Sequence, residues 1–239
     1  MSSQDKIDTH KNTIALLKNF FDSNQRKRKN LLSKLDLAVN DIYEVLDDIL
    51  PFIDKEGDDW AGGWIFQLLK KNKPEIFKRK EFDGWFLTDS KAGIDYSELQ
   101  LNLLNQNFEE ADRLTSCYLR KLAGKVAEKR GYVFYSEVGN MAGEDLVSID
   151  RLWNIYSQGK FGFSIQAKLL KSVGKRYDLL WPKIGWKIDG VWTRYPTSFS
   201  WSLDAPEGHM PLVNQLRGVR LMDSILRHPS IALRHNNCL

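Results

Sequence analysis

Hydrophobic residues recur every three or four positions along the first third of the chain, which is the period of an amphipathic helix. The stretches with this period are 14–21, 31–49 and 64–69. Asp8 and Thr9 precede the first stretch and are typical helix N-cap residues. Pro51 must interrupt the second, and Gly62–Gly63 indicates a break before the third. Helices this short do not hold their shape alone, so we expect residues 1–86 to pack as a small helical bundle.

The stretch 83–93 carries turn-forming residues and little periodicity, and we place a domain boundary there. Helical spacing resumes near Tyr96 and continues to about Lys129, with one break near Asn105. Two further helical patterns follow before position 180. We therefore expect a second helical domain over residues 94–233.

Strand signals are weak along the whole chain. The exception is the stretch 186–192, where Asp189–Gly190 predicts the turn of a small hairpin. Phe161 and Phe163 most simply anchor a helix start, with Ser164 as its N-cap. The predicted fold class is all-α.

Aromatic side chains are densest between positions 181 and 201. They are Trp181, Trp186, Trp192, Tyr195, Phe199 and Trp201. Prolines interrupt this segment and its continuation, and a helical pattern with Arg217 and Arg220 near its start comes next. Aromatics on irregular backbone suit a concave surface that holds a flat apolar ligand, with cations ready for an acidic group at its edge.

The composition is that of an ordinary soluble globular protein, with 239 residues, 42% hydrophobic and 28% charged. The formal net charge of +4 permits an acidic ligand or a weak peripheral association with a membrane surface, and it argues against nucleic acid as a partner. We expect a monomer.

Cysteine usage and the N-terminus bear on the compartment. Cys117 and Cys238 have no metal-ligand spacing and no disulfide framework, which indicates a reducing compartment. No apolar run approaches the ~20 residues of a membrane span. Acidic residues at positions 5, 8 and 22 argue against a secretory signal and mildly against a transit peptide.

Four blocks of sequence carry a resemblance to a known family. They are SIDRLWNIYSQGKFGFSIQ (148–166), IGWKIDGVWTRYP (184–196), DAPEGHMP (204–211) and NQLRGVR (214–220). In this order and spacing they resemble the Genomes-Uncoupled-Four family, and the resemblance covers roughly 95–231. The N-terminal bundle also resembles the accessory helical domain of cyanobacterial and algal members.

The resemblance implies a function and a fold. Members bind protoporphyrin IX and magnesium-protoporphyrin IX, and they stimulate magnesium chelatase in chlorophyll biosynthesis through its large porphyrin-binding subunit. The ligand domain is a cupped hand of helices with two gripping loops, here 132–145 and 198–214. The implied host is photosynthetic, so the chain belongs in a plastid stroma as a plastid-encoded protein, or in a cyanobacterial cytoplasm. No redox cofactor is implied.

A porphyrin is an apolar disc with two propionates on one edge. Burying roughly 400 Å² at ~25 cal/mol/Å² gives about 10 kcal/mol, which an association cost on the order of 4–15 kcal/mol offsets. Charge-assisted hydrogen bonds to the propionates can therefore decide the affinity. We expect Arg217, and less strongly Arg220, to supply them. The expected apolar wall is Trp192, Tyr195, Phe199, Trp201, Met210, Leu212 and Leu216, with Tyr132, Phe134 and Tyr135 on the opposite arm and Val126 and Leu122 on the floor.

Other interpretations stay open. His209 or Asn214 is a conceivable magnesium contact, although magnesium prefers oxygen ligands and water. Asp204, Glu207 and His209 resemble an acid–base set, but no catalytic motif accompanies them, so we expect no enzymatic activity. The aromatic loops also fit a protein-binding adaptor, and a noncovalently bound linear bilin would use the same contacts as a porphyrin.

Overall fold

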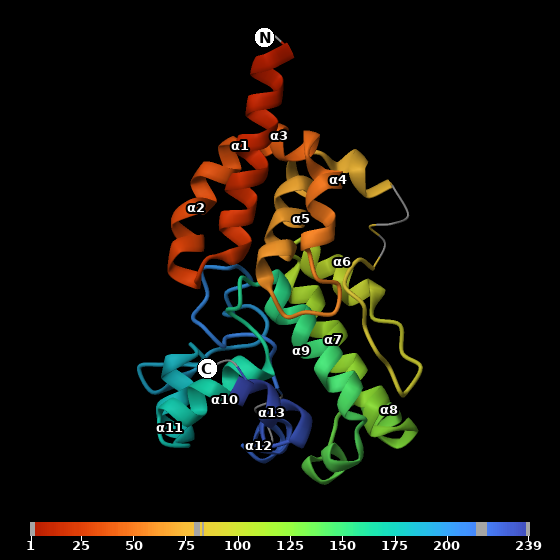
Figure 1. The fold of residues 1–239 in the computed structure, drawn as a ribbon. Coiled ribbons are helices and arrows are strands. Elements are labelled where there is room, and N and C mark those ends of the chain that lie inside the picture. The colour runs from red at the N-terminus through yellow and green to blue at the C-terminus, as the bar shows by residue number, and fades with distance from the viewer. Residues whose placement is uncertain (1–2, 79–81, 83, 214–218, 238–239) are drawn as a thin grey trace. The chain divides into compact units, whose positions relative to one another are not determined.

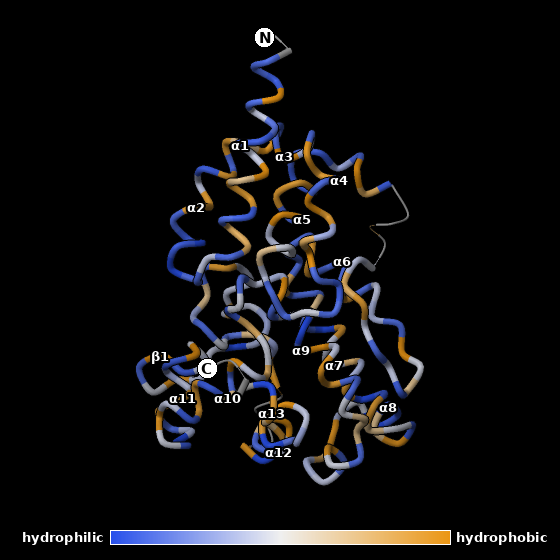
Figure 2. The backbone as a smooth tube through the Cα atoms, viewed as in Figure 1, coloured by the Kyte–Doolittle hydropathy of each residue, from blue (hydrophilic) through white to orange (hydrophobic). Residues whose placement is uncertain are grey.

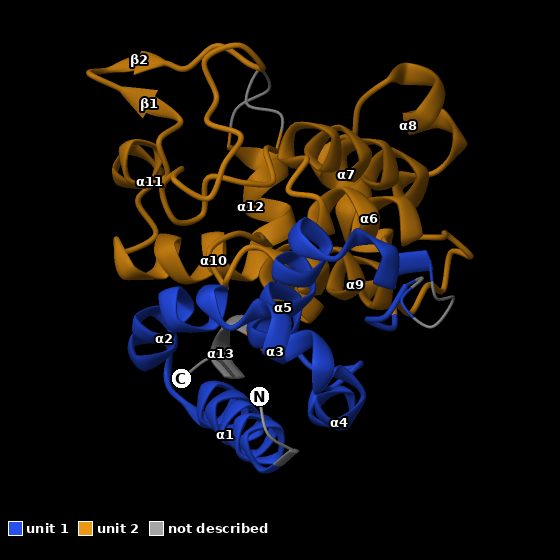
Figure 3. Cartoon of the chain, turned by 90° about the horizontal axis from the view of Figure 1, so that it is seen from above, with its two compact units in different colours: residues 1–87 blue, residues 88–239 orange. Residues whose placement is uncertain are grey.

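The computed structural model describes residues 3–78, 82, 84–213 and 219–237. The chain divides into two compact units, residues 1–87 and 88–239 (Figure 3). This division lies inside the stretch 83–93 that the sequence indicates as a boundary. Within the described ranges, no helix combines the length and apolarity needed to span a bilayer.

Unit 1 is a helical bundle (Figure 1). Its elements are α1 (Ser3–Asp22), α2 (Gln25–Leu37), α3 (Val39–Glu44), α4 (Leu46–Ile49), the 3₁₀ turn η1 (Leu50–Phe52), α5 (Trp60–Asn72) and the 3₁₀ turn η2 (Pro74–Lys78). Helix α5 is hydrophobic over much of its length, whereas α2 is mostly hydrophilic (Figure 2). Nine residues of α5 are buried, against Leu35 alone in α2, so α5 forms the core of the bundle.

Two predicted helix boundaries in unit 1 are wrong. Helix α1 begins at Ser3, so Asp8 and Thr9 lie inside it, where the Thr9 hydroxyl donates to the Asp5 carbonyl one turn back. The Gly62–Gly63 pair does not break α5, because the N-cap of this helix is Asp59, whose carboxylate accepts the Ala61 N–H.

Unit 2 is also helical, with one small hairpin. Its elements are α6 (Ser97–Leu104), α7 (Phe108–Ala123), α8 (Lys125–Arg130), the 3₁₀ turn η4 (Tyr135–Asn140), α9 (Gly143–Tyr156), α10 (Phe163–Ser172), α11 (Tyr177–Lys183), β1 (Lys187–Ile188), β2 (Val191–Trp192), α12 (Arg220–Leu226) and α13 (Pro229–Asn237). The all-α prediction is confirmed. The predicted break near Asn105 separates α6 from α7, and a second break at Gly124 was not predicted.

Buried aromatic and polar groups fix the core of unit 2. Trp153 is fully buried, stacks 6.1 Å from Phe108 and donates to the Thr115 hydroxyl at 2.9 Å. The fully buried carboxylate of Asp145 accepts the Tyr96 hydroxyl at 2.7 Å. Such satisfied polar groups specify one packing arrangement of α6, α7 and α9.

The start of α10 differs from the prediction. Gly162 is its N-cap, and Ser164 lies in the first turn, where its N–H donates to the buried Asp150 carboxylate at 2.9 Å. A side chain on Gly162 would meet Asn154 and Asp150 at 2.5 and 2.7 Å, and its φ is 131°. The Asp150 carboxylate from α9 thus accepts a backbone N–H at the start of α10, the role predicted for the Ser164 side chain.

Candidate functional site

The β1–β2 hairpin of unit 2 lies next to two stacked tryptophans, Trp181 and Trp186. The predicted Asp189–Gly190 turn is present, with φ of 49° and 82°, and Lys187 pairs with Trp192 across the two strands. Trp186 is fully buried, stacks 5.5 Å from Trp181 at an interplanar angle of 10°, and donates to the His209 carbonyl at 2.7 Å. Trp192 packs 5.5 Å from Trp181 yet stays 43% exposed. Trp181 and Trp186 are therefore buried, while Trp192, which packs on Trp181, stays partly exposed to solvent.

A second aromatic group follows the hairpin. The rings of Phe199 and Trp201 stack at 5.6 Å, and Tyr195 lies 5.8 Å from each. The Trp201 indole donates to the Pro196 carbonyl at 3.1 Å, which ties the loop to itself. Tyr195 is 47% exposed while Phe199 is buried. Three of the expected wall residues thus form one cluster, with Tyr195 outermost.

The end of this loop is fastened to α7. The Leu212 N–H donates to Asp112 Oδ1 at 2.5 Å, and Asp112 Oδ2 is buried without a hydrogen bond from the described residues. Burial raises the pKa of Asp112 to about 7. Burial, and then the charge of Asp112, raise the pKa of Tyr195 to about 12. One buried carboxylate is therefore linked to both ends of the aromatic loop.

Met210, an expected wall residue, is fully buried. The Gln166 side chain donates to the carbonyls of Gly208 and Pro211 on either side of it, at 3.0 and 2.9 Å. These bonds hold the backbone against α10, so in this structure Met210 packs in the core instead of lining a surface. Leu212 is half-buried.

His209 is also a packing residue here. Its ring lies 4.9 Å from Phe199, and its Nδ1 donates to the Ile184 carbonyl at 2.7 Å, which makes Nε2 the unprotonated nitrogen. Burial lowers the pKa of His209. Asp204 and Glu207, the other two residues that resemble an acid–base set, are exposed to solvent, whereas the His209 imidazole is buried. Among the described residues, no group of three or more metal-ligating side chains gathers.

The segment 125–140, here called the α8–η4 arm, is organised by an arginine that the sequence analysis missed. The Arg130 guanidinium pairs with Glu137 at 2.6 Å and donates to the Tyr132 carbonyl at 2.9 Å. It lies 4.7 Å from the centre of the Tyr132 ring and 4.0 Å from that of Phe134. Burial works to raise the pKa of Glu137, but the Phe134 N–H and Arg130 outweigh it and the pKa is lowered. An arginine just before Gly131, with aromatics two and four positions later, was the available signal.

The expected arm 132–145 is more regular than a loop, because residues 135–140 form η4 and α9 begins at Gly143. Phe134 and Tyr135 are 42% and 47% exposed, Val126 is 71% exposed, and Tyr132 and Leu122 are half-buried. The Arg220 guanidinium lies 5.4 Å from the centre of the Tyr135 ring. The N-terminus of α12 is thereby brought to the α8–η4 arm.

The hairpin and the α8–η4 arm lie on opposite sides of α12 (Figures 1 and 3). Each side presents partly exposed aromatic rings, and the first residue of α12 is a cation. The predicted site residues Asn214, Leu216 and Arg217 lie outside the described residues. Unit 2 therefore offers an aromatic surface in two parts with a cation at one of them.

Known proteins are similar to this chain in sequence and in fold. A family model described as GUN4-like matches residues 89–229. A Ycf53-like protein of Synechocystis sp. is 39% identical over 91% of this chain and 96% of its own length. A tetrapyrrole-binding protein, chloroplastic, of Arabidopsis thaliana is 38% identical over 59% of this chain and 57% of its own. The solved structure of GUN4 from Chlamydomonas reinhardtii superposes with a TM-score of 0.58, at 38% identity, over 61% of this chain and 93% of that one. The chain belongs to the GUN4-like family, the Genomes-Uncoupled-Four family that its sequence resembles.

Proposed function

We propose that this chain is a non-enzymatic regulator that binds protoporphyrin IX and magnesium-protoporphyrin IX. In this proposal it delivers porphyrin to the large subunit of magnesium chelatase and stimulates that enzyme in chlorophyll biosynthesis. It would act as a monomer in a plastid stroma or a cyanobacterial cytoplasm. The Arabidopsis relative is a tetrapyrrole-binding protein, which supports a tetrapyrrole as the ligand class.

The observation that carries this proposal is the pair of aromatic surfaces flanking α12. Trp192 and Tyr195 on one side, and Phe134 and Tyr135 on the other, are each between 42% and 47% exposed. Large aromatic side chains left this accessible on two segments that flank one helix are typical of a binding surface. An apolar disc lying between them would bury the ring faces that now contact water.

The acidic edge of the disc requires a cation. Arg220 stands at the first position of α12, beside the α8–η4 arm, so it can meet a propionate while the aromatic rings cover the disc. Arg217 is proposed for the second propionate on the sequence resemblance alone. Phe199, Trp201 and Leu212 support the aromatic loop in this proposal, and Met210 is buried at its end.

A quenching titration tests the proposal. Tryptophan fluorescence is followed as deuteroporphyrin or its magnesium form is added to the wild-type chain, to Arg220→Ala and to Arg176→Ala. Arg176 is an exposed, ion-paired arginine outside the proposed site and serves as the matched control. We expect saturable binding that weakens about tenfold in Arg220→Ala and less than about twofold in the control.

A second assay addresses the chelatase. Magnesium insertion by purified magnesium chelatase is measured with and without the chain, and we expect stimulation by the wild type. A chain that binds porphyrin without stimulating the enzyme would leave only the ligand half of the proposal. A chain that binds no porphyrin would favour the adaptor, in which the same aromatic surface docks a protein.

A further inference from the structure

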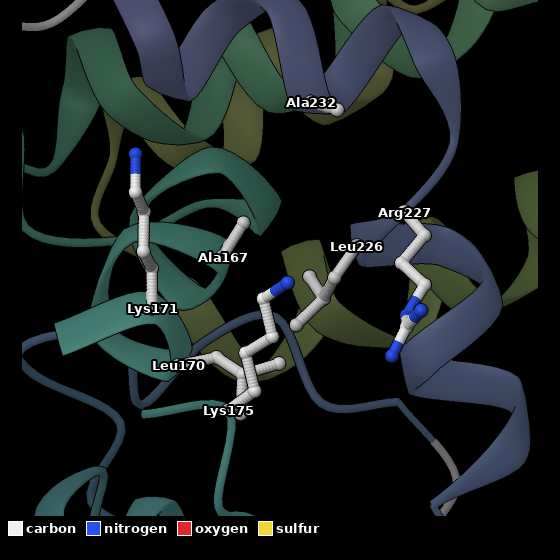
Figure 4. Close-up of a pocket in the computed structure, with 7 residues that line it drawn as sticks. All are labelled: Ala167, Leu170, Lys171, Lys175, Leu226, Arg227 and Ala232. Carbon is white, nitrogen blue, oxygen red and sulfur yellow. The ribbon is translucent and has the colours of Figure 1, made fainter. Parts of the chain in front are cut away.

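Unit 2 contains a cavity of about 300 Å³ that shares no residue with the candidate site. It lies among α10, α12 and α13 (Figure 4). Its floor is apolar, since Ala167, Leu170 and Leu226 line it and each is at least nine-tenths buried. An apolar cavity of roughly 150 Å³ accommodates benzene, so this one has room for a short alkyl chain and a head group.

Three cationic side chains stand around this floor. Lys171 lies in the last turn of α10, Lys175 lies in the turn that follows this helix, and Arg227 follows the last residue of α12. Figure 4 shows Lys175 running across the apolar residues, between Leu170 and Leu226. All three residues are exposed. The cavity therefore combines an apolar floor with a positive rim.

Lys175 belongs to the turn that ends α10. Gly174 and Lys175 both have positive φ, 67° and 61°, and the Lys175 N–H donates to the Leu170 carbonyl at 2.8 Å. A residue with a side chain rarely adopts this conformation, and its cost is on the order of 1 kcal/mol. Cations near a helix C-terminus also stabilise the helix through its dipole. That effect alone does not explain why the Lys175 side chain lies across the cavity.

Arg227 is held in place by its neighbours. Its Nε donates to Asp223 Oδ1 at 2.8 Å, and the Tyr177 hydroxyl donates to the same oxygen at 2.9 Å. No other acceptor among the described residues bonds this guanidinium, so its two terminal amino groups remain available for an oxyanion. With Asp223 counted, the rim keeps two positive charges.

We propose that this cavity binds a small amphipathic anion, a phosphate or carboxylate carried on a short apolar stem. The head accepts hydrogen bonds from Lys175 and Arg227, with Lys171 adding charge, and the stem lies on Leu170 and Leu226. Free phosphate esters and the head groups of anionic lipids share this chemistry.

Isothermal titration with hexyl phosphate tests the proposal on the full chain. We expect Lys175→Gln to weaken binding about tenfold or more, because a charged hydrogen bond is lost. The matched control is Lys168→Gln, which removes the same charge from an exposed position of α10 that does not line the cavity. This control should change the affinity less than about twofold.

Vesicles distinguish the two sources. Flotation with phosphatidylglycerol vesicles, against phosphatidylcholine vesicles, reports a lipid head group, whereas hexyl phosphate binding without flotation reports a free anion. Either result supports the cavity if Lys175→Gln weakens the binding as expected and Lys168→Gln does not. Binding of neither probe, an undiminished affinity in Lys175→Gln, or equal losses in the two variants would overturn it. Deuteroporphyrin binding, measured in the same variants, should not change, so failure here is separable from failure of the porphyrin proposal.

Discussion

Aromatic residues cluster in both units, but the cluster around Phe66 in unit 1 is largely buried, whereas unit 2 also leaves several clustered rings half-exposed. In unit 1 the Phe66 ring lies 5.3–6.4 Å from the rings of Phe77, Phe82, Trp85 and Phe86. Phe66 is 1% exposed and Trp85 7%, whereas Trp192 of unit 2 is 43% exposed. Aromatic density alone therefore does not identify a binding surface. What distinguishes unit 2 is that buried rings, such as Trp186, support neighbouring rings that remain partly exposed to solvent.

Truncating the centre of the buried cluster gives the largest expected effect. We expect Phe66→Ala to lower the free energy of unfolding of unit 1 by about 3–5 kcal/mol, because it leaves a cavity among four rings. Native-state hydrogen exchange of peptides from α5 measures the loss without assuming that the two units unfold together. Phe134→Ala, measured in α9 peptides, should cost less than about 1 kcal/mol. Equal losses of unfolding free energy in Phe66→Ala and Phe134→Ala would contradict the proposed difference between the two clusters.

The buried Asp112 carboxylate makes the stability of unit 2 depend on pH. Its pKa of about 7 lies above the ordinary value of 3.8, so between these values the folded chain holds a proton that the unfolded chain has released. Its contribution to the free energy of unfolding therefore falls as pH rises from about 4 to 7, by on the order of 2–4 kcal/mol. Asp112→Asn, which keeps the acceptor for Leu212, should remove this decrease.

The measurement for Asp112 is the difference between variant and wild type in urea unfolding at several pH values. A direct reading of the wild type is insufficient, because burial lowers the pKa of His209 and His228 and their contributions rise with pH. A difference between the two chains that stays constant from pH 4 to 7 would contradict the assignment.

The exposed rings should contribute to ligand affinity and contribute little to folding stability. We expect Trp192→Ala to weaken deuteroporphyrin binding about 3–10-fold, the equivalent of a lost aromatic contact of ~0.5–1.5 kcal/mol, with unfolding free energy changed by less than about 1 kcal/mol. Titration and urea unfolding of the same sample provide both numbers. If the ring were instead needed for folding, the unfolding free energy would drop while the affinity of the folded fraction held.

The smallest effects are expected from the exposed and partly exposed arginine ion pairs, with Arg130 the larger of two cases. Replacing it with Gln should lower stability by about 0.5–1.5 kcal/mol, since its ion pair with Glu137 is 18% and 24% exposed. Hydrogen exchange should quicken in residues 132–137. The Arg113–Glu110 pair is 58% and 40% exposed, and Arg113→Gln should cost less than about 0.5 kcal/mol. Arg130 loses its assigned role if exchange in 132–137 is the same in both variants.

The elements that the sequence predicts well are those set by local chemistry. The hydrophobic period gives the helical class, and Asp189–Gly190 gives the hairpin because few residue pairs adopt two positive φ values. Exposure of Trp192 and Tyr195 also agrees with the expectation of an accessible aromatic segment. These features depend on neighbours close in sequence.

The features that the sequence missed depend on distant neighbours. Gly62 reads as a helix breaker, but a Cβ there would meet Ile53 at 2.5 Å, so the glycine allows close packing of α5. Met210 reads as an exposed wall residue, but Gln166, 44 positions earlier, holds its backbone in the core. Arg130 is the exception, because its partners Tyr132, Phe134 and Glu137 all follow within seven positions. For Gly62 and Met210, no local pattern contains the contacts.

The central claim is that the half-exposed rings of unit 2, and not the buried ring cluster of unit 1, contact the tetrapyrrole. Hydrogen–deuterium exchange of the full chain with and without saturating deuteroporphyrin tests it most directly. The account predicts slower exchange in residues 132–137 and 192–201 and unchanged exchange in 60–72. Slower exchange confined to 60–72, or none in either aromatic segment at saturation, would contradict it.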